Sequence, residues 1–96
     1  MQTVIGLGQA GCNIADCMKL YPEYDILKID TGLKKTKKTL GFKEQKSSEL
    51  YEEKTPKTLN KFLEIVGDET LFITSCGAVS GASLRILEKI KDKTKI

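Results

Sequence analysis

Near its N-terminus the chain reads Val4-Ile5-Gly6-Leu7-Gly8-Gln9-Ala10-Gly11-Cys12-Asn13-Ile14, which carries the strongest fold signal in the sequence. The apolar run at its start is typical of a strand that is buried on both faces. In the Gly-x-Gly-x-x-Gly motif that follows, the first glycine permits a tight turn, the second lets backbone approach a phosphate, and the third lets a helix pack on the strand. The helix N-terminus then offers free N–H groups to an anion. Residues 4–16 are therefore predicted to bind the phosphates of a nucleotide.

Strands and helices alternate along the rest of the chain. Further strands are expected at 25–30 and 71–74, a helix at 56–66 with Thr55 as its N-cap, and a last helix after Ser83. Helical spacing predicts these core-facing positions: Ala10, Ile14, Cys17, Met18 and Tyr21 in the first helix, Leu59, Phe62, Leu63 and Val66 in the second, and Leu84, Leu87 and Ile90 in the last.

Residues 31–54 are the least readable segment. They are too many for a structureless loop in a compact domain. We expect a short extra element in them, either a strand near Leu40–Lys43 or a turn of helix near Leu50.

This alternation predicts an α/β fold of three layers, a Rossmann-like parallel sheet with helices on both faces and right-handed crossovers. With the first strand central and its two successors on either side, ligands would bind at the carboxyl ends of the strands. The small-residue turn at 75–83, which follows the strand at 71–74, would flank the same crevice as the glycine motif.

Length and composition narrow the class of protein. The 96 residues suit one domain, 1–96, and a net charge of +3 is too mild to indicate nucleic acid as a partner. Three cysteines and no histidine give no disulfide framework and no zinc pattern, which favours a reduced, cytoplasmic setting. We expect no signal peptide and no membrane span, because the apolar stretches are short.

Three features outside the glycine motif have a chemical interpretation. Asp30 ends the second strand, about 20 residues after the motif, where dinucleotide-binding folds place an acid on the ribose, although Asp-Thr-Gly is also ordinary turn chemistry. Cys12 has no histidine to act as its base, so apolar packing is the better interpretation. The lysine run at 34–38 is typical of a solvated surface, or of a contact to phosphate or an acidic partner.

The glycine motif also resembles that of a known family. Gly8-Gln9-Ala10-Gly11-Cys12-Asn13-Ile14 looks like the first nucleotide loop of tubulin, and Val4 to Gly8 are similar to the opening of FtsZ. The segments at 24–31 and 71–83 resemble the second strand and the phosphate-binding signature loop of FtsZ in the same order. The narrower resemblance is to phage-encoded tubulin-like proteins.

The resemblance implies the N-terminal part of a tubulin/FtsZ-type domain that binds GTP or GDP with Mg²⁺ and belongs to a filament-forming cytoskeletal GTPase. It implies that Gly8, Gln9, Ala10 and Gly11 approach the phosphates, with Gln9 nearest the metal. Asn13 would face the ribose or base. The outer phosphates would be cradled by Gly77, Ser80, Gly81 and Ser83.

Two departures from the family pattern limit what this chain is expected to do. The signature loop, normally GGGTGSG, carries side chains at Ala78, Val79 and Ala82, which predicts altered binding of the outer phosphate. The family's central helix, catalytic loop and second domain have no counterpart here, so hydrolysis by this chain alone is not expected. We expect a fragment or a reduced form, with apolar surface exposed on the last helix or at the sheet edge, where missing chain or self-association would cover it.

Two alternatives to a tubulin-type GTP-binding domain stay open. One is an NAD-type dinucleotide-binding half-domain, which the motif together with Asp30 favours. The other is a non-enzymatic assembly or regulatory module with a degenerate nucleotide site, which the altered second turn favours.

Overall fold

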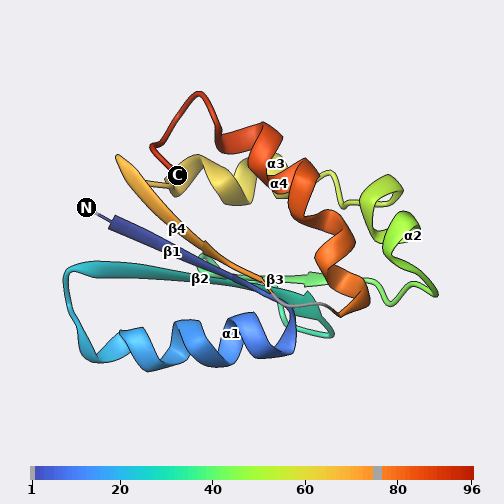
Figure 1. Ribbon diagram of the computed structural model, residues 1–96, viewed down its shortest axis with the longest axis horizontal. Helices are drawn as coiled ribbons and strands as arrows, with labels where there is room; N and C mark the ends of the chain where they lie inside the picture. Colours follow the sequence, from blue (N-terminus) through green and yellow to red (C-terminus); the bar gives the residue numbers. More distant parts are fainter. Residues whose placement is uncertain (1, 75–76) are drawn as a thin grey trace.

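The computed structural model describes residues 2–74 and 77–96 (Figure 1). The elements in chain order are β1 (Gln2–Leu7), α1 (Gly8–Cys17), the 3₁₀ turn η1 (Met18–Leu20), β2 (Tyr24–Thr31), β3 (Thr39–Phe42), α2 (Ser48–Glu53), α3 (Leu59–Phe62), η2 (Leu63–Ile65), β4 (Glu69–Ile73), η3 (Ala78–Ala82) and α4 (Ser83–Ile90).

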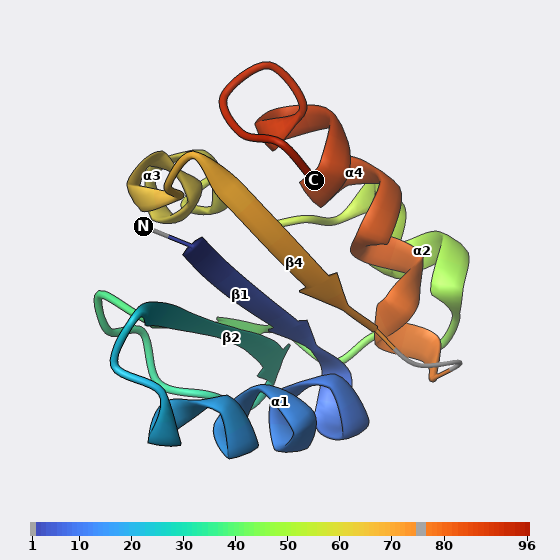
Figure 2. The same ribbon diagram turned by 60° about the vertical axis from the view of Figure 1, so that its left-hand side comes forward.

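The four strands form one parallel sheet in the order β3-β2-β1-β4. β1 lies inside the sheet, where Val4 pairs with Ile26 of β2 on one side and with Leu71 of β4 on the other. Figure 2 shows β1 between these two neighbours. The predicted α/β class, the parallel sheet and the inner position of the first strand are confirmed.

Helices lie on both faces of the sheet, α1 on one and α2, α3 and α4 on the other (Figure 1). The α1 side holds a small core of Val4, Ala15 and Ile26. The opposite side holds the larger core, built on Ile5, Leu7, Leu27, Ile29, Leu40 and Phe42 of the sheet. This two-sided burial explains why the strands read as nearly continuous apolar runs.

The buried face of α1 differs from the one predicted. Ala10, Ile14, Cys17 and Tyr21 are exposed and Met18 is half-buried, whereas the buried residues are Gly8, Gly11, Cys12 and Ala15. The physical reason is close packing, since only small side chains let the helix axis come near β1. A Cβ on Gly6 would stand 2.9 Å from the Ala15 Cβ.

The segment 31–54 contains both of the elements that were expected as alternatives. β3 covers the predicted strand, and α2 covers the predicted turn of helix, capped by the Ser47 side chain, which accepts the Leu50 N–H. The helix expected at 56–66 is shorter than predicted. It begins at Leu59 after a turn in which the Leu59 N–H donates to the Pro56 carbonyl, so Thr55 is not its N-cap.

The last helix is rotated relative to the prediction. Ile86 and Ile90 are buried, Leu87 is partly buried, and Leu84 is 55% exposed. The rotation arises because the chain enters α4 through η3, whose Val79 and Ala82 are already buried in the larger core.

Apolar surface is exposed where the sequence predicted it. Leu84 is exposed on the last helix, and Leu71 on the edge strand β4 is 51% exposed. The C-terminal segment covers only the start of that edge, where Lys95 forms a parallel bridge with Glu69. None of the helices in residues 2–74 and 77–96 combines the length and the hydropathy that a membrane span requires.

Candidate functional site

The roles of the three glycines differ in part from those predicted, because Gly6 lies inside β1 and the turn is made by Gly8. Gly8 has φ 79°, a left-handed conformation that side chains disfavour, and it carries the chain from β1 into α1. Gly6 and Gly11 are packing positions. A Cβ on Gly6 would stand 2.6 Å from the Gly11 carbonyl oxygen, and a Cβ on Gly11 would stand 2.5 Å from the Ile73 carbonyl oxygen.

The N-terminus of α1 is open to an anion. Leu7 is its N-cap residue, in an extended conformation, and no side chain caps the helix. The first turn carries no acidic residue. Gln9, Ala10 and Asn13 are exposed. The first backbone N–H groups of a helix have no partner within the helix, so they can donate to an oxyanion here.

The second turn begins at the neighbouring strand end. Because Gly11 lies against Ile73, the last residue of β4, the start of α1 lies beside the point where the second turn leaves the sheet. Gly77 and Ala78 are exposed, and the Ser80 hydroxyl and N–H both donate to the Gly77 carbonyl. The sequence prediction for Ser75 and Cys76 lies outside the described residues.

Gly81 and Ser83 have surroundings that the sequence did not indicate. A Cβ on Gly81 would overlap the Ser48 carbonyl oxygen, so this glycine lets η3 pack on the start of α2. The Ser83 hydroxyl is buried with no hydrogen-bond partner among the described residues. Of the three side chains expected to crowd a phosphate, Val79 and Ala82 are instead buried in the core, and Ala78 alone is exposed.

Cys12 is a packing residue, as predicted. It is 8% exposed, and its Sγ lies 3.4 Å from the Gly6 carbonyl oxygen and 3.5 Å from that of Ile29, either of which can accept the single thiol proton. Burial raises the pKa of the Cys12 thiol, and the nearby Asp30 carboxylate raises it further. A high thiol pKa opposes a nucleophilic role.

Asp30 follows Ile29, the residue of β2 that pairs with Leu7 at the end of β1. Its carboxylate Oδ1 accepts the Thr31 N–H at 2.8 Å, which satisfies the turn interpretation. Asp30 lies at the same edge of the sheet as the glycine turn, Gly6–Gly11, so its position is also compatible with the ribose interpretation.

One ion-pair cluster lies on the α1 side of the sheet. Asp16 of α1 contacts Lys28 of β2 and Lys19 of η1, each at 3.0 Å. The ammonium groups of Lys19 and then of Lys28 lower the pKa of Asp16, and the Asp16 carboxylate raises the pKa of Lys28. These ion pairs hold the C-terminal half of α1 on the sheet.

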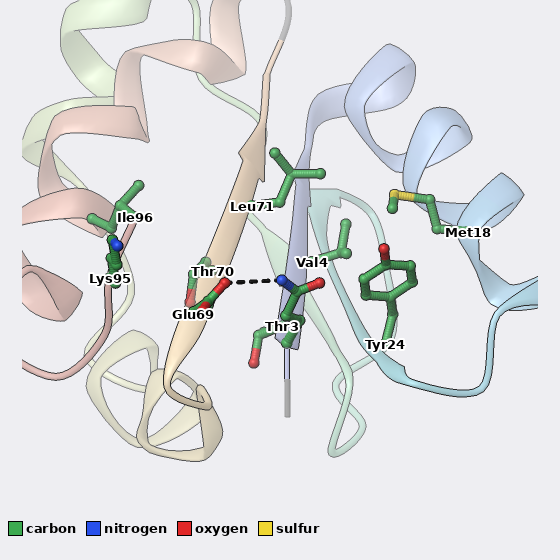
Figure 3. A pocket seen from close by; sticks show the side chains of 10 residues that line it. Thr3, Val4, Met18, Tyr24, Glu69, Thr70, Leu71, Lys95 and Ile96 are labelled. Atoms are coloured by element: carbon green, nitrogen blue, oxygen red, sulfur yellow. Dashed lines mark hydrogen bonds between the residues drawn. The ribbon is translucent and has the colours of Figure 1, made fainter.

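Four cavities lined by described residues lie away from the glycine turn, Gly6–Gly11. These cavities of the described residues, about 260 to 710 Å³, are lined by none of the nine candidate residues. One of about 300 Å³ lies at the amino ends of β1 and β4, the edge opposite the glycine turn (Figure 3). There the Gln2 side-chain amide donates to the Glu69 carboxylate at 2.9 Å.

The comparisons with known proteins do not assign the chain to a family. No family model, no curated protein and no solved structure matches it. Among the described residues, no cluster of three or more cysteine, aspartate and glutamate side chains could hold a metal ion.

Proposed function

We propose that the chain binds the phosphates of a guanine nucleotide at the N-terminus of α1. One observation carries the proposal: Gly8, with its positive φ, starts an uncapped helix between the carboxyl ends of β1 and β4. Strand order reverses at this point of the sheet, because the chain runs outward from β1 to β2 and β3 and then returns to β4 beyond β1. Ligands of open parallel sheets bind at such points.

The guanine preference rests on the tubulin-like sequence from Gly8 to Ile14. In this proposal the N–H groups of Gln9 and Ala10 donate to the phosphates, and the Gln9 side chain lies nearest to a Mg²⁺ that the nucleotide carries. Asn13, exposed one turn further along α1, contacts the ribose or base.

In this proposal the exposed start of the second turn contacts the outer phosphates. Gly77 is the donor proposed there, with the unpartnered Ser83 hydroxyl as a second, while the hydroxyl and N–H of Ser80 donate to the Gly77 carbonyl and hold the turn in shape. Gly81 supports the turn from the α2 side, since it packs on Ser48. Filament formation, and GTP hydrolysis in a longer tubulin-like protein, belong to the same proposal.

A dinucleotide such as NAD is the second candidate. The observation in its favour is Asp30, whose carboxylate lies at the end of β2, where a ribose acid is expected. A third candidate, an assembly module without nucleotide binding, is favoured by the packing of Gly81 on Ser48, which takes this glycine away from a phosphate.

A titration of the chain with GTP, GDP, ATP and NAD, with and without Mg²⁺, tests these candidates by calorimetry. Guanine preference supports the proposal, binding of NAD alone replaces it with the second candidate, and no binding favours the third.

The matched pair Ala10→Glu and Leu20→Glu locates the site. Both positions are exposed and lie near opposite ends of the α1–η1 helix, and both variants add the same charge. A carboxylate at Ala10 would compete for the free N–H groups and repel phosphate, so we expect at least about a tenfold loss of affinity there, equal to ~1.4 kcal/mol, and little change for Leu20→Glu. Equal affinities in the two variants would place the nucleotide elsewhere.

A further inference from the structure

The largest of the four cavities, about 710 Å³, lies on the other face of the sheet from α1. One wall is the connection between β2 and β3, residues 35–38, and the opposite wall is α3 and η2. Its volume is within the range of pockets that bind small organic molecules.

Lysines from both walls line this cavity: Lys35, Lys37 and Lys38 from the connection and Lys61 from α3. Two acidic residues also line it. Asp25 is already paired with Lys38, whose Nζ lies 2.8 Å from its carboxylate, which leaves Glu64 against three lysines. The cavity is therefore net cationic.

The same cavity has an apolar part. Phe62 is almost fully buried and anchors α3 in the core, while Ile65 beside it is 46% exposed. An exposed isoleucine in a cavity rimmed by lysines offers contact area to an apolar group, while the ammonium groups offer ion pairs to an anion.

Hydrogen bonds hold the lysine-bearing connection in one shape. The Thr36 hydroxyl accepts the N–H groups of Lys38 and Thr39, the Thr36 N–H donates to the Thr39 carbonyl, and the Thr39 hydroxyl donates to the Lys34 carbonyl at 2.6 Å. The Lys38 carbonyl in turn accepts the Lys28 N–H of β2. The backbone that carries these lysines is thus ordered before any ligand arrives, which reduces the entropic cost of binding.

We propose that this cavity binds a small amphipathic anion, with an apolar tail against Phe62 and Ile65 and a carboxylate or phosphate head among Lys35, Lys37 and Lys61. A bare anion would use only the exposed ammonium groups, whose attraction is screened by salt. A neutral apolar molecule would leave these cations without counterion. The site is separate from the glycine turn and does not depend on the nucleotide proposal.

Titration with three probes tests the chemistry by ¹H–¹⁵N NMR of the chain. Decanoate carries both head and tail, inorganic phosphate carries charge alone, and 1-decanol carries the tail alone. We expect decanoate to bind at least about tenfold more tightly than either of the others, because it alone makes both contacts. Its shifts should centre on Lys35, Lys61 and Ile65 rather than on Gln9. Equal affinity for phosphate, or shifts spread over all lysines, would overturn the proposal.

Charge-matched variants exclude general electrostatic attraction. The double variant Lys35→Glu with Lys61→Glu should lower decanoate affinity about tenfold, whereas Lys91→Glu with Lys93→Glu, which makes the same change of charge on exposed residues after α4, should not. Circular dichroism and thermal unfolding establish that each variant is folded. Equal losses in the two double variants would contradict the site.

A second pair of variants and a vesicle control complete the test. Ile65→Ser should weaken decanoate binding several-fold and leave phosphate binding unchanged, and Leu20→Ser, at an apolar position that is 84% exposed, should change neither. Vesicles of phosphatidylglycerol and phosphatidylcholine distinguish a free ligand from a membrane surface. Sedimentation with these vesicles in the absence of a decanoate response would replace the small-molecule site with a membrane contact.

Discussion

Gly11 of α1 lies directly against the carbonyl of Ile73, the last residue of β4, with no room for a side chain between them. The glycine motif therefore joins three elements, because Gly6 of β1 also lies against Gly11. A position that the sequence associates with phosphate is equally a packing position between α1 and β4.

This contact predicts that Gly11→Val destabilises the fold whether or not a nucleotide is bound. The new side chain meets backbone that can move only if β4 shifts away from α1, and overpacking of this kind costs about 1–3 kcal/mol or more. Urea unfolding measures the loss. Gly32→Asn is the control, because Gly32 has φ 76° with open space around it and asparagine tolerates that conformation. Equal stability of the Gly11 variant and the parent would show that α1 and β4 are not in contact.

Thr3 predicts a second stability effect. Its buried hydroxyl accepts the Gly67 N–H at 2.8 Å and so fixes the approach to β4 on β1. Thr3→Val keeps the shape but leaves that N–H without its partner, at a cost of about 1–3 kcal/mol. Thr3→Ser keeps the acceptor and should lose less stability. Unfolding free energies in the reverse order would contradict the role of the hydrogen bond.

The ion pairs of Asp16 predict a pH dependence. The pKa of Asp16 is lowered in the folded chain, so its contribution is present above the unfolded pKa of about 4 and is lost as the pH falls through the lower folded value. Since the Asp16 side chain is 42% exposed, we expect less than about 1 kcal/mol. Asp16→Asn should reduce the difference in stability between pH 7 and pH 2.

The control for this variant is Asp92→Asn. Asp92 makes none of the ion pairs found among the described residues. An equal change in the pH dependence of both variants would mean that net charge, and not the Asp16 cluster, produces it.

The cysteines predict a difference in reactivity. Cys17 is exposed, whereas Cys12 is buried and its pKa is raised by burial. Iodoacetamide at pH 8, followed by peptide mass mapping, should label Cys17 rapidly and Cys12 only in urea. Fast labelling of Cys12 in the folded chain would show that α1 separates readily from the sheet.

The sheet could be predicted because its signals are local. The apolar runs at β1, β2 and β4 each end at a glycine or a small-residue turn, and alternation with helices requires parallel strands. Only the short β3 fell in a segment without a clear pattern, because its pairing depends on the connection from 32 to 38 folding back alongside β2.

The buried faces of the helices were harder to predict, because the most hydrophobic residues of a helix are not always the ones that contact the sheet. The large apolar residues of α1, Ile14 and Tyr21, stay outside, while Gly11 and Ala15 make the contact. Glycine and alanine add little to a hydrophobic periodicity, so the sequence pattern predicted that the opposite face of α1 is buried.

Part of the candidate site could be predicted from the sequence and part could not. A tight turn between β1 and α1 could be predicted from the motif, but the sequence assigned it to Gly6, whereas the residue with positive φ is Gly8. The packing of Gly81 on Ser48 could not be predicted, because the contact joins residues far apart in the sequence. The cationic cavity was missed for that reason too: the lysine run was visible, but Lys61 and Ile65 join it only through the fold.

Residues at the two ends of the described chain form hydrogen bonds to two residues that are neighbours in the sequence. The Gln2 side chain donates to Glu69, and the Lys95 N–H donates to the Asp68 carbonyl. A short linker could therefore join the ends, and new termini could be opened between Glu44 and Gln45, in the connection from β3 to α2, without cutting a strand or helix. Such a circular permutant would keep the sheet while placing the glycine turn in the middle of the sequence.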